Sequence, residues 1–128
     1  MIPILADQCV TSFLNEADRL GVAVRWEKEM TNLDAAYVAL PGKPGEILLF
    51  DRAPRPGNPE ICTLLAHEMV HVLQHWKGNL RGTPPLGWRV DDAQKRRNLS
   101  LQQREAYTAQ ENPAKVLRAV RALEPTTP

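Results

Sequence analysis

The stretch that most constrains the fold is residues 60–77, EICTLLAHEMVHVLQHWK, which has the length and composition of one continuous helix. Asn58 can cap this helix, Pro59 suits its first position, and Glu60 favours the positive end of the helix dipole. Gly78 then ends it. The polar residues of a helix this apolar are partly buried, and we expect the small sheet of the domain to pack on it.

This helix contains all three histidines of the chain, spaced four residues apart: His67, His71 and His75. Side chains four residues apart leave the same face of a helix. The neighbouring residues are apolar, namely Leu64, Leu65, Val70, Val72 and Leu73. Partly buried polar groups need partners. The pattern therefore favours a binding site over three solvated histidines that happen to share one face.

The chain before this helix indicates one further helix and three short strands. Apolar residues at helical spacing predict a helix in the stretch ADQCVTSFLNEADRL (6–20), and Gly21 ends it. Residues 22–26 alternate as a strand does. The runs DAAYVAL (34–40) and EILLF (46–50) flank the loop PGKPG, which predicts a hairpin.

The chain after this helix indicates a long irregular loop and two more helices. Residues 78–98 are rich in Gly, Pro and charge. Ser100 and Gln103 form a capping box for a helix from Leu101, and Asn112 can cap a last helix. We therefore predict an α+β fold, in which a small three-stranded sheet packs on helix 60–77, together with an N-terminal helix, the helix from Leu101 and a C-terminal helix.

Composition limits the classes of protein to which this chain can belong. Its 128 residues suffice for one domain with its own core, which we expect to span residues 1–128. Apolar residues make up 43% and the net charge is +1, so nothing suggests attraction to nucleic acid or to anionic membranes. No run is long enough to span a bilayer, and the N-terminus MIPILADQCV lacks a basic leader. We expect a cytoplasmic monomer.

The two cysteines, Cys9 and Cys62, both fall in expected helices. Small buried thiols and a disulfide are both compatible with that placement. We expect two buried thiols.

The sequence HEMVH at residues 67–71 suggests a zinc site. His67 and His71 lie one helical turn apart and can occupy two corners of a zinc tetrahedron. Glu68 follows the first histidine, where it can reach a water molecule that the metal activates without binding the metal itself. We expect one Zn²⁺ per chain, with Glu68 as the general base.

A catalytic zinc needs a third protein ligand and leaves the fourth position to water. His75 lies about 12 Å along the helix from His67 at 1.5 Å per residue, too far for both to bind one ion. We therefore expect His75 at the edge of the cleft, as a possible substrate contact. The third ligand is then a downstream carboxylate.

The candidate carboxylates are Asp91, Asp92, Glu105 and Glu111. The two aspartates fall in the loop, and helices hold ligands more precisely than loops do. Glu105 lies one turn into a capped helix and is our choice. Glu111 comes second.

These motifs resemble the gluzincins, zinc peptidases with an HExxH helix and a downstream glutamate ligand. AHEMVH is similar to their active-site helix, and REAYTA to the glutamate helix, which supports Glu105 as the third ligand. DAAY followed by EILLFD resembles their edge strand and the strand after it. The short chain is most similar to the compact minigluzincins. The resemblance covers roughly residues 20–112.

The resemblance implies a peptidase that hydrolyses an extended peptide or protein substrate. The edge strand would pair with that substrate, which gives Ala35, Ala36 and Tyr37 a substrate-binding role. Full gluzincins place a His or Tyr from a C-terminal subdomain over the oxyanion, and this chain has no such subdomain. Tyr37, His75 and Arg104 are possible substitutes, whereas Tyr107 is expected to point away from the ligand face.

Two alternatives stay open. The protein could be a regulatory metallopeptidase with one dedicated target. It could also be a latent or inactive zinc-stabilised binding module that uses the same fold without turnover.

Overall fold

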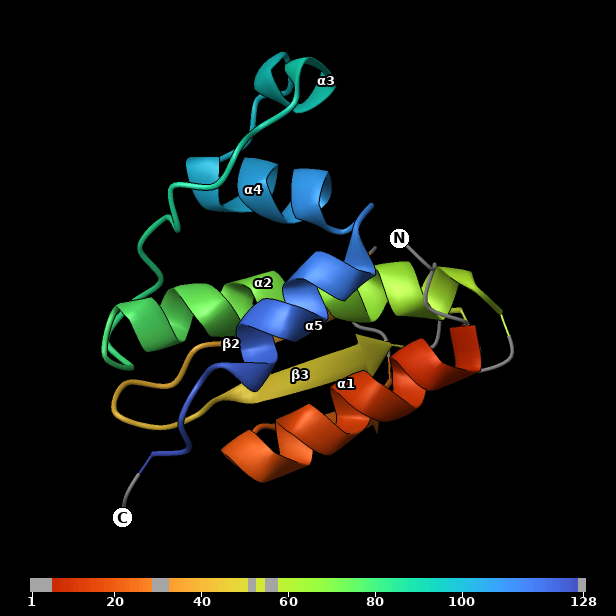
Figure 1. Ribbon diagram of the computed structural model, residues 1–128, viewed down its shortest axis with the longest axis vertical. Coiled ribbons are helices and arrows are strands. Elements are labelled where there is room, and N and C mark those ends of the chain that lie inside the picture. Colours follow the sequence, from red (N-terminus) through yellow and green to blue (C-terminus); the bar gives the residue numbers. More distant parts are fainter. Residues whose placement is uncertain (1–5, 29–32, 51–52, 55–57, 127–128) are drawn as a thin grey trace.

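The computed structural model describes residues 6–28, 33–50, 53–54 and 58–126, and within them five helices and three strands form an α+β fold (Figure 1). In chain order the elements are α1 (Ala6–Leu20), β1 (Ala23–Glu27), β2 (Ala35–Val38), β3 (Glu46–Phe50), α2 (Glu60–Lys77), α3 (Asp92–Lys95), α4 (Leu101–Ala109) and α5 (Pro113–Arg121). This order confirms the expected fold class. None of the helices in the described ranges has the length and apolar character needed to cross a membrane.

The sheet has the strand order β1-β3-β2, so β3 is the central strand. β1 pairs with β3 in parallel and β2 pairs with it in antiparallel register, with Tyr37 opposite Ile47. The expected hairpin is thus confirmed. Its turn needs a glycine at residue 45, where φ is +86° and an added Cβ would lie 2.5 Å from the carbonyl oxygen of Val38. The hairpin leaves β2 at the edge of the sheet.

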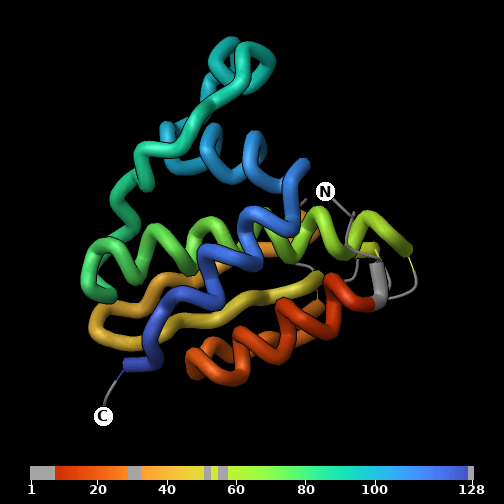
Figure 2. Tube along the Cα trace, in the orientation of Figure 1, coloured from red at the N-terminus to blue at the C-terminus, as the bar shows by residue number. Residues whose placement is uncertain are grey.

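Helix α2 is the centre of the molecule. It packs against β2 of the sheet and also against α1, α4 and α5 (Figures 1 and 2). It begins at Glu60, whose backbone N–H donates to the Asn58 side chain at 3.0 Å, while Pro59 occupies the cap position itself. Gly78 ends it as predicted. These contacts explain why most residues of this helix are buried.

The segment after α2 carries the chain away from this centre and back. In Figure 2 it rises from the C-terminal end of α2 to the short helix α3, and α4 then returns across α2. The predicted caps are present: Ser100 accepts from the backbone N–H of Gln103, and Asn112 accepts from that of Lys115. Helix α3, capped by Asp91, was not predicted, because four residues are too few to show a periodicity.

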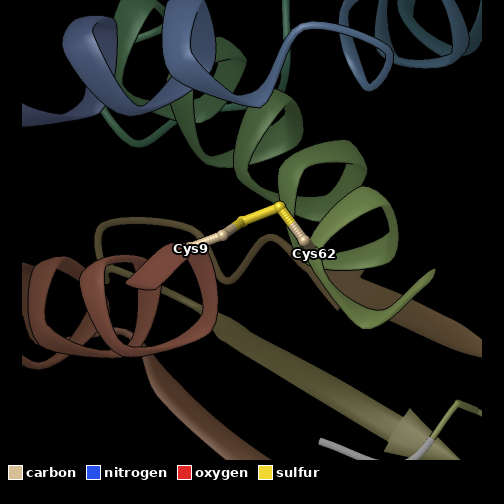
Figure 3. The surroundings of a disulfide bond; sticks show 2 residues. All are labelled: Cys9 and Cys62. Carbon is tan, nitrogen blue, oxygen red and sulfur yellow. A yellow bond between two sulfur atoms is a disulfide. The ribbon is translucent and has the colours of Figure 1, made fainter. Parts of the chain in front are cut away.

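Cys9 and Cys62 are joined in a disulfide between α1 and α2 (Figure 3). The expectation of two free thiols is therefore wrong. Their Cα atoms lie 5.7 Å apart, within the range that a disulfide spans, and both residues are buried. The bond links the first full turn of α2 to the N-terminal helix, 53 residues away in sequence.

Candidate metal centre

His67, Glu68 and His71 form the one cluster of possible metal ligands found among the described residues. One ligand atom from each lies within 4.8 Å of the others, so the group can hold a metal ion. All three come from the middle of α2, where helical spacing places the two imidazoles one turn apart. His67 and Glu68 are buried and His71 is half-buried.

A residue of α4 closes the cluster from the opposite side. Oε1 of Gln103 lies 3.0 Å from Nε2 of His67 and 3.1 Å from Nε2 of His71. The two imidazoles therefore direct the same ring nitrogen to a common point. The sequence did not single out Gln103 for this position.

Gln74 determines which nitrogen of His71 carries the proton. Its NH₂ group donates to the backbone carbonyl of Gln102 at 3.1 Å and to Glu105 at 3.2 Å, and both of these partners can only accept. The amide oxygen of Gln74 therefore faces the other way, and it lies 2.8 Å from Nδ1 of His71. Nδ1 must donate, which leaves a lone pair on Nε2 of His71.

Gln110 faces His67 in a similar way, but its own amide is held by a longer and exposed contact. Its amide oxygen lies 2.8 Å from Nδ1 of His67, and its NH₂ group faces the carboxylate of Glu111 at 3.4 Å. This orientation again assigns the ring proton to Nδ1. Both histidines thus present Nε2 as a lone pair toward the shared point.

Three acceptor atoms therefore converge: the two Nε2 atoms and Oε1 of Gln103. With the Gln103 amide in this orientation none of the three can donate to another, and a cation at this point would satisfy all of them. Zinc bonds of 2.0–2.1 Å in a tetrahedron place neighbouring ligands about 3.3 Å apart. The observed separations of 3.0 and 3.1 Å are close to that value, so the donor set fits a small divalent ion.

Burial shifts the titration of all three cluster residues. Desolvation lowers the pKa of His67 to about 4, with a further contribution from the neighbouring His71, and it also lowers the pKa of His71. Both rings are therefore neutral at pH 7, as metal ligands have to be. Desolvation raises the pKa of Glu68 to about 8 in the protein without metal. A bound cation would oppose this last shift by favouring the carboxylate.

The cluster opens into a cavity of about 1000 Å³ that is bounded by β2, α2 and α4. His67, Glu68 and His71 line one side of it. Ala35, Ala36 and Tyr37 of the edge strand β2 line another, so the structure brings the predicted substrate strand to the predicted metal ligands.

Glu105 lies outside the cluster, and its position does not support the expectation that it is the third ligand. Its fully buried carboxylate accepts four hydrogen bonds, from Gln74 and from the backbone N–H groups of Leu86, Gly87 and Trp88. A carboxylate has about four lone-pair sites, so none is left for a metal. The third ligand was expected on α4, and α4 does meet the cluster. The face of α4 that meets it carries Gln103, however, and not Glu105. Glu111, the second choice, is exposed.

His75 is also placed differently from the expectation. It is fully buried, and its ring nitrogens face backbone carbonyls: Nδ1 faces Gly82, and Nε2 faces Leu40 and Lys43. It does not line the cavity. Its position therefore does not support the expected substrate contact, and His75 joins the hairpin loop to the end of α2.

The residues considered for oxyanion stabilisation differ in their partners and in their position relative to the cluster. The Tyr37 hydroxyl donates to the carbonyl of Pro44, and burial raises the pKa of this phenol. Arg104 donates to the carbonyl of Arg97 and does not line the cavity. Tyr107, which was expected to point away, packs its ring edge-on against His67 with the centroids 4.5 Å apart.

The spacing of three residues in and just after α4 could have predicted which face of this helix meets the cluster. Gln103, Tyr107 and Gln110 lie at positions i, i+4 and i+7, so they share one face of the polypeptide, and all three contact His67. Each of these three side chains can contact a histidine. Their common face could therefore have been predicted to pack against the two histidines of helix 60–77.

The three residues of the HExxH motif that can hold a metal lie together at the cavity. Comparisons with known protein families, with curated proteins and with solved structures found no match to this chain.

Proposed function

We propose that this protein is a zinc-dependent peptidase. The observation that carries the proposal is the cluster of His67, Glu68 and His71 in the wall of a cavity whose opposite wall is an edge strand. Two neutral imidazoles with free Nε2 lone pairs favour zinc over magnesium or calcium, which prefer oxygen ligands. The amide oxygen of Gln103 is the third protein donor in this proposal.

Glu68 is the proposed catalytic base. When bound, a zinc ion supplies Lewis acidity, which makes a water molecule more acidic and polarises the carbonyl of the scissile bond. The Glu68 carboxylate, within 4.8 Å of the histidine ligand atoms, would accept the proton of the attacking water. It would then return that proton to the leaving nitrogen.

The edge strand β2 is the proposed substrate-binding strand. β3 uses one edge of β2, and β2 ends the order of the sheet, so its other edge can pair with an extended peptide. Ala35 and Ala36 have small side chains that leave room in the cavity for those of a substrate. Backbone pairing of this kind fixes the peptide direction while leaving the side-chain preference to the cavity walls.

One observation favours a second candidate, a latent or zinc-stabilised binding module. The third donor in the cluster is the neutral amide of Gln103, whereas a carboxylate in that position would bind zinc more tightly and balance its charge. A regulatory peptidase with a single target is the other alternative, and it shares the chemistry of the main proposal.

Glu68→Gln tests the proposal because it removes the base and keeps the size of the side chain. Zinc content, the melting temperature with zinc bound and digestion of a broad peptide library should be measured for wild type and variant. We expect zinc to remain and hydrolysis to fall by about 10² to 10⁴. Glu27→Gln, on β1 and away from the cavity, is the matched control and should hydrolyse peptides as the wild type does.

Three results separate the candidates. Full activity in Glu68→Gln would rule out this mechanism. Loss of zinc from Glu68→Gln would make Glu68 a ligand. Zinc binding without any hydrolysis by the wild type would support the binding module.

A further inference from the structure

Glu105, the residue that the sequence suggested as a ligand, is linked to the metal cluster in another way. Its carboxylate accepts from the NH₂ group of Gln74 at 3.2 Å, and the oxygen of the same amide lies 2.8 Å from Nδ1 of His71. Glu105 and Gln74 are both fully buried, so water does not compete for these contacts. A continuous chain of hydrogen bonds therefore leads from the carboxylate to the imidazole.

The orientation of the Gln74 amide is determined by the acceptors on its nitrogen side. The Glu105 carboxylate and the Gln102 carbonyl both require N–H donors. Turning the amide over would place its oxygen against these two acceptors inside the protein, which is costly without water. The amide oxygen is thus held toward His71.

We propose that Gln74 and Glu105 are positioning residues of the metal site: Glu105 orients the Gln74 amide, which keeps the proton of His71 on Nδ1 and leaves Nε2 free to bind the ion. This inference deepens the proposed function and rests on its metal site. A histidine ligand commonly donates its other ring N–H to an acceptor that fixes the tautomer and the ring plane. Here that acceptor is an amide, and a buried carboxylate behind it fixes the direction of the amide.

The same carboxylate also ties the loop after α2 to the site. Its remaining lone pairs accept from the backbone N–H groups of Leu86, Gly87 and Trp88 at 2.7–3.0 Å. Gly87 has φ of +83°, a conformation that glycine adopts readily and that lets three successive N–H groups converge on one carboxylate. Formation of this loop and orientation of His71 therefore depend on one side chain.

The test is the tautomer of His71 in metal-free protein, which does not depend on activity or on zinc. Histidine labelled with ¹⁵N allows NMR to tell Nδ1–H from Nε2–H. We expect His71 of the wild type to carry its proton on Nδ1. In Gln74→Met, which keeps the length but loses the amide, we expect that preference to be lost and zinc affinity to fall 10- to 100-fold.

Gln102→Met is the matched control, since the side chain of this half-buried glutamine donates to the Thr83 carbonyl and is not among the hydrogen-bond partners of the three histidines in the described residues. It should leave the tautomer and the zinc affinity unchanged. Glu105→Gln tests the outer link. The double variant with Gln74→Met and Glu105→Gln should lose less zinc-binding free energy than the sum of the losses in the two single variants.

Either of two results would overturn the inference: Nε2–H on His71 in the wild type, or an unchanged Nδ1–H in Gln74→Met. Full additivity of the two substitutions would remove Glu105 from the proposed chain. The wild type could fail to bind zinc while His71 still carries its proton on Nδ1 and loses that preference in Gln74→Met. The proposed function would then fail, and the contact that positions His71 would stand. The two failures are thus distinguishable.

Discussion

The side-chain oxygen of Gln103 lies 3.0 Å from Nε2 of His67, at the position of the third protein donor in the proposed zinc site. An amide oxygen is neutral and donates to zinc more weakly than a carboxylate. Gln103→Glu should therefore raise zinc affinity at least about tenfold, and Gln103→Met should lower it about 10- to 100-fold. Competition with a fluorescent chelator would measure both dissociation constants.

The matched control for this pair is Glu124→Gln, which changes an exposed side chain outside the cavity lining and should leave zinc affinity within about twofold. If Gln103→Glu and Gln103→Met shift the affinity in the same direction, the amide is not a ligand. The donor set would then have to be completed by another group, Glu68 being the nearest.

The stability of the metal-free protein should depend on pH through Glu68. Its pKa is raised from an ordinary value of about 4.3 in the unfolded chain to about 8 in the folded protein. The folded state therefore holds this proton more tightly, and that stabilisation is present at pH 4 and lost as the pH rises to 8. Glu68→Gln stays neutral throughout.

The melting temperature of Glu68→Gln minus that of the wild type should thus increase from pH 5 to pH 8.5 in the presence of EDTA. Both proteins share the shifts of His67 and His71, so the difference isolates Glu68. Saturating zinc should reduce this pH dependence, because the cation favours the carboxylate. A difference that stays constant with pH would show that Glu68 is not desolvated.

The features of the fold and site that could be predicted from the sequence are local ones. Helix 60–77 shows its caps, its apolar residues and its histidine spacing within one stretch, so its bounds and the pair His67 and His71 followed directly. The hairpin was predictable for a similar reason, since the loop PGKPG separates two short apolar runs.

The features that could not be predicted depend on how distant segments pack. Helix α4 is short and polar on most sides, so its periodicity does not tell which face meets α2, and the expected ligand was Glu105, whereas Gln103 is the residue of α4 that lies at the cluster. His75 has the same spacing as His67 and His71, but it is one turn further along, where the hairpin loop and the 78–82 segment enclose it. The disulfide likewise requires α1 to pack across the first turns of α2.

The disulfide should make a large contribution to stability. Closing a loop across 53 residues restricts the unfolded chain and is worth about 4 kcal/mol by chain entropy. Reduction, or the substitution Cys9→Ala with Cys62→Ala, should lower the free energy of unfolding by up to that amount in urea titrations. A thiol titration of the unfolded, unreduced protein should find no free cysteine, and two free thiols would contradict the bond.

His75 should matter for stability and not for zinc or substrate. Its ring is fully buried and faces the carbonyls of Gly82, Leu40 and Lys43 at 2.8–3.1 Å. His75→Phe keeps an aromatic ring but leaves these carbonyls without a side-chain donor, which should lower the free energy of unfolding by about 1 to 3 kcal/mol. His75→Gln, whose NH₂ group can still donate, should recover part of that loss.

Urea titration would measure the stability of both His75 variants, and zinc content and the KM for any cleaved peptide would be measured well below the unfolding transition. We expect the last two to match the wild type, because the His75 ring points to the two loops and lies outside the cavity lining. A raised KM in a well-folded His75→Gln would return this histidine to the substrate site. Loss of zinc with the fold intact would mean that the loops it joins also shape the metal cluster.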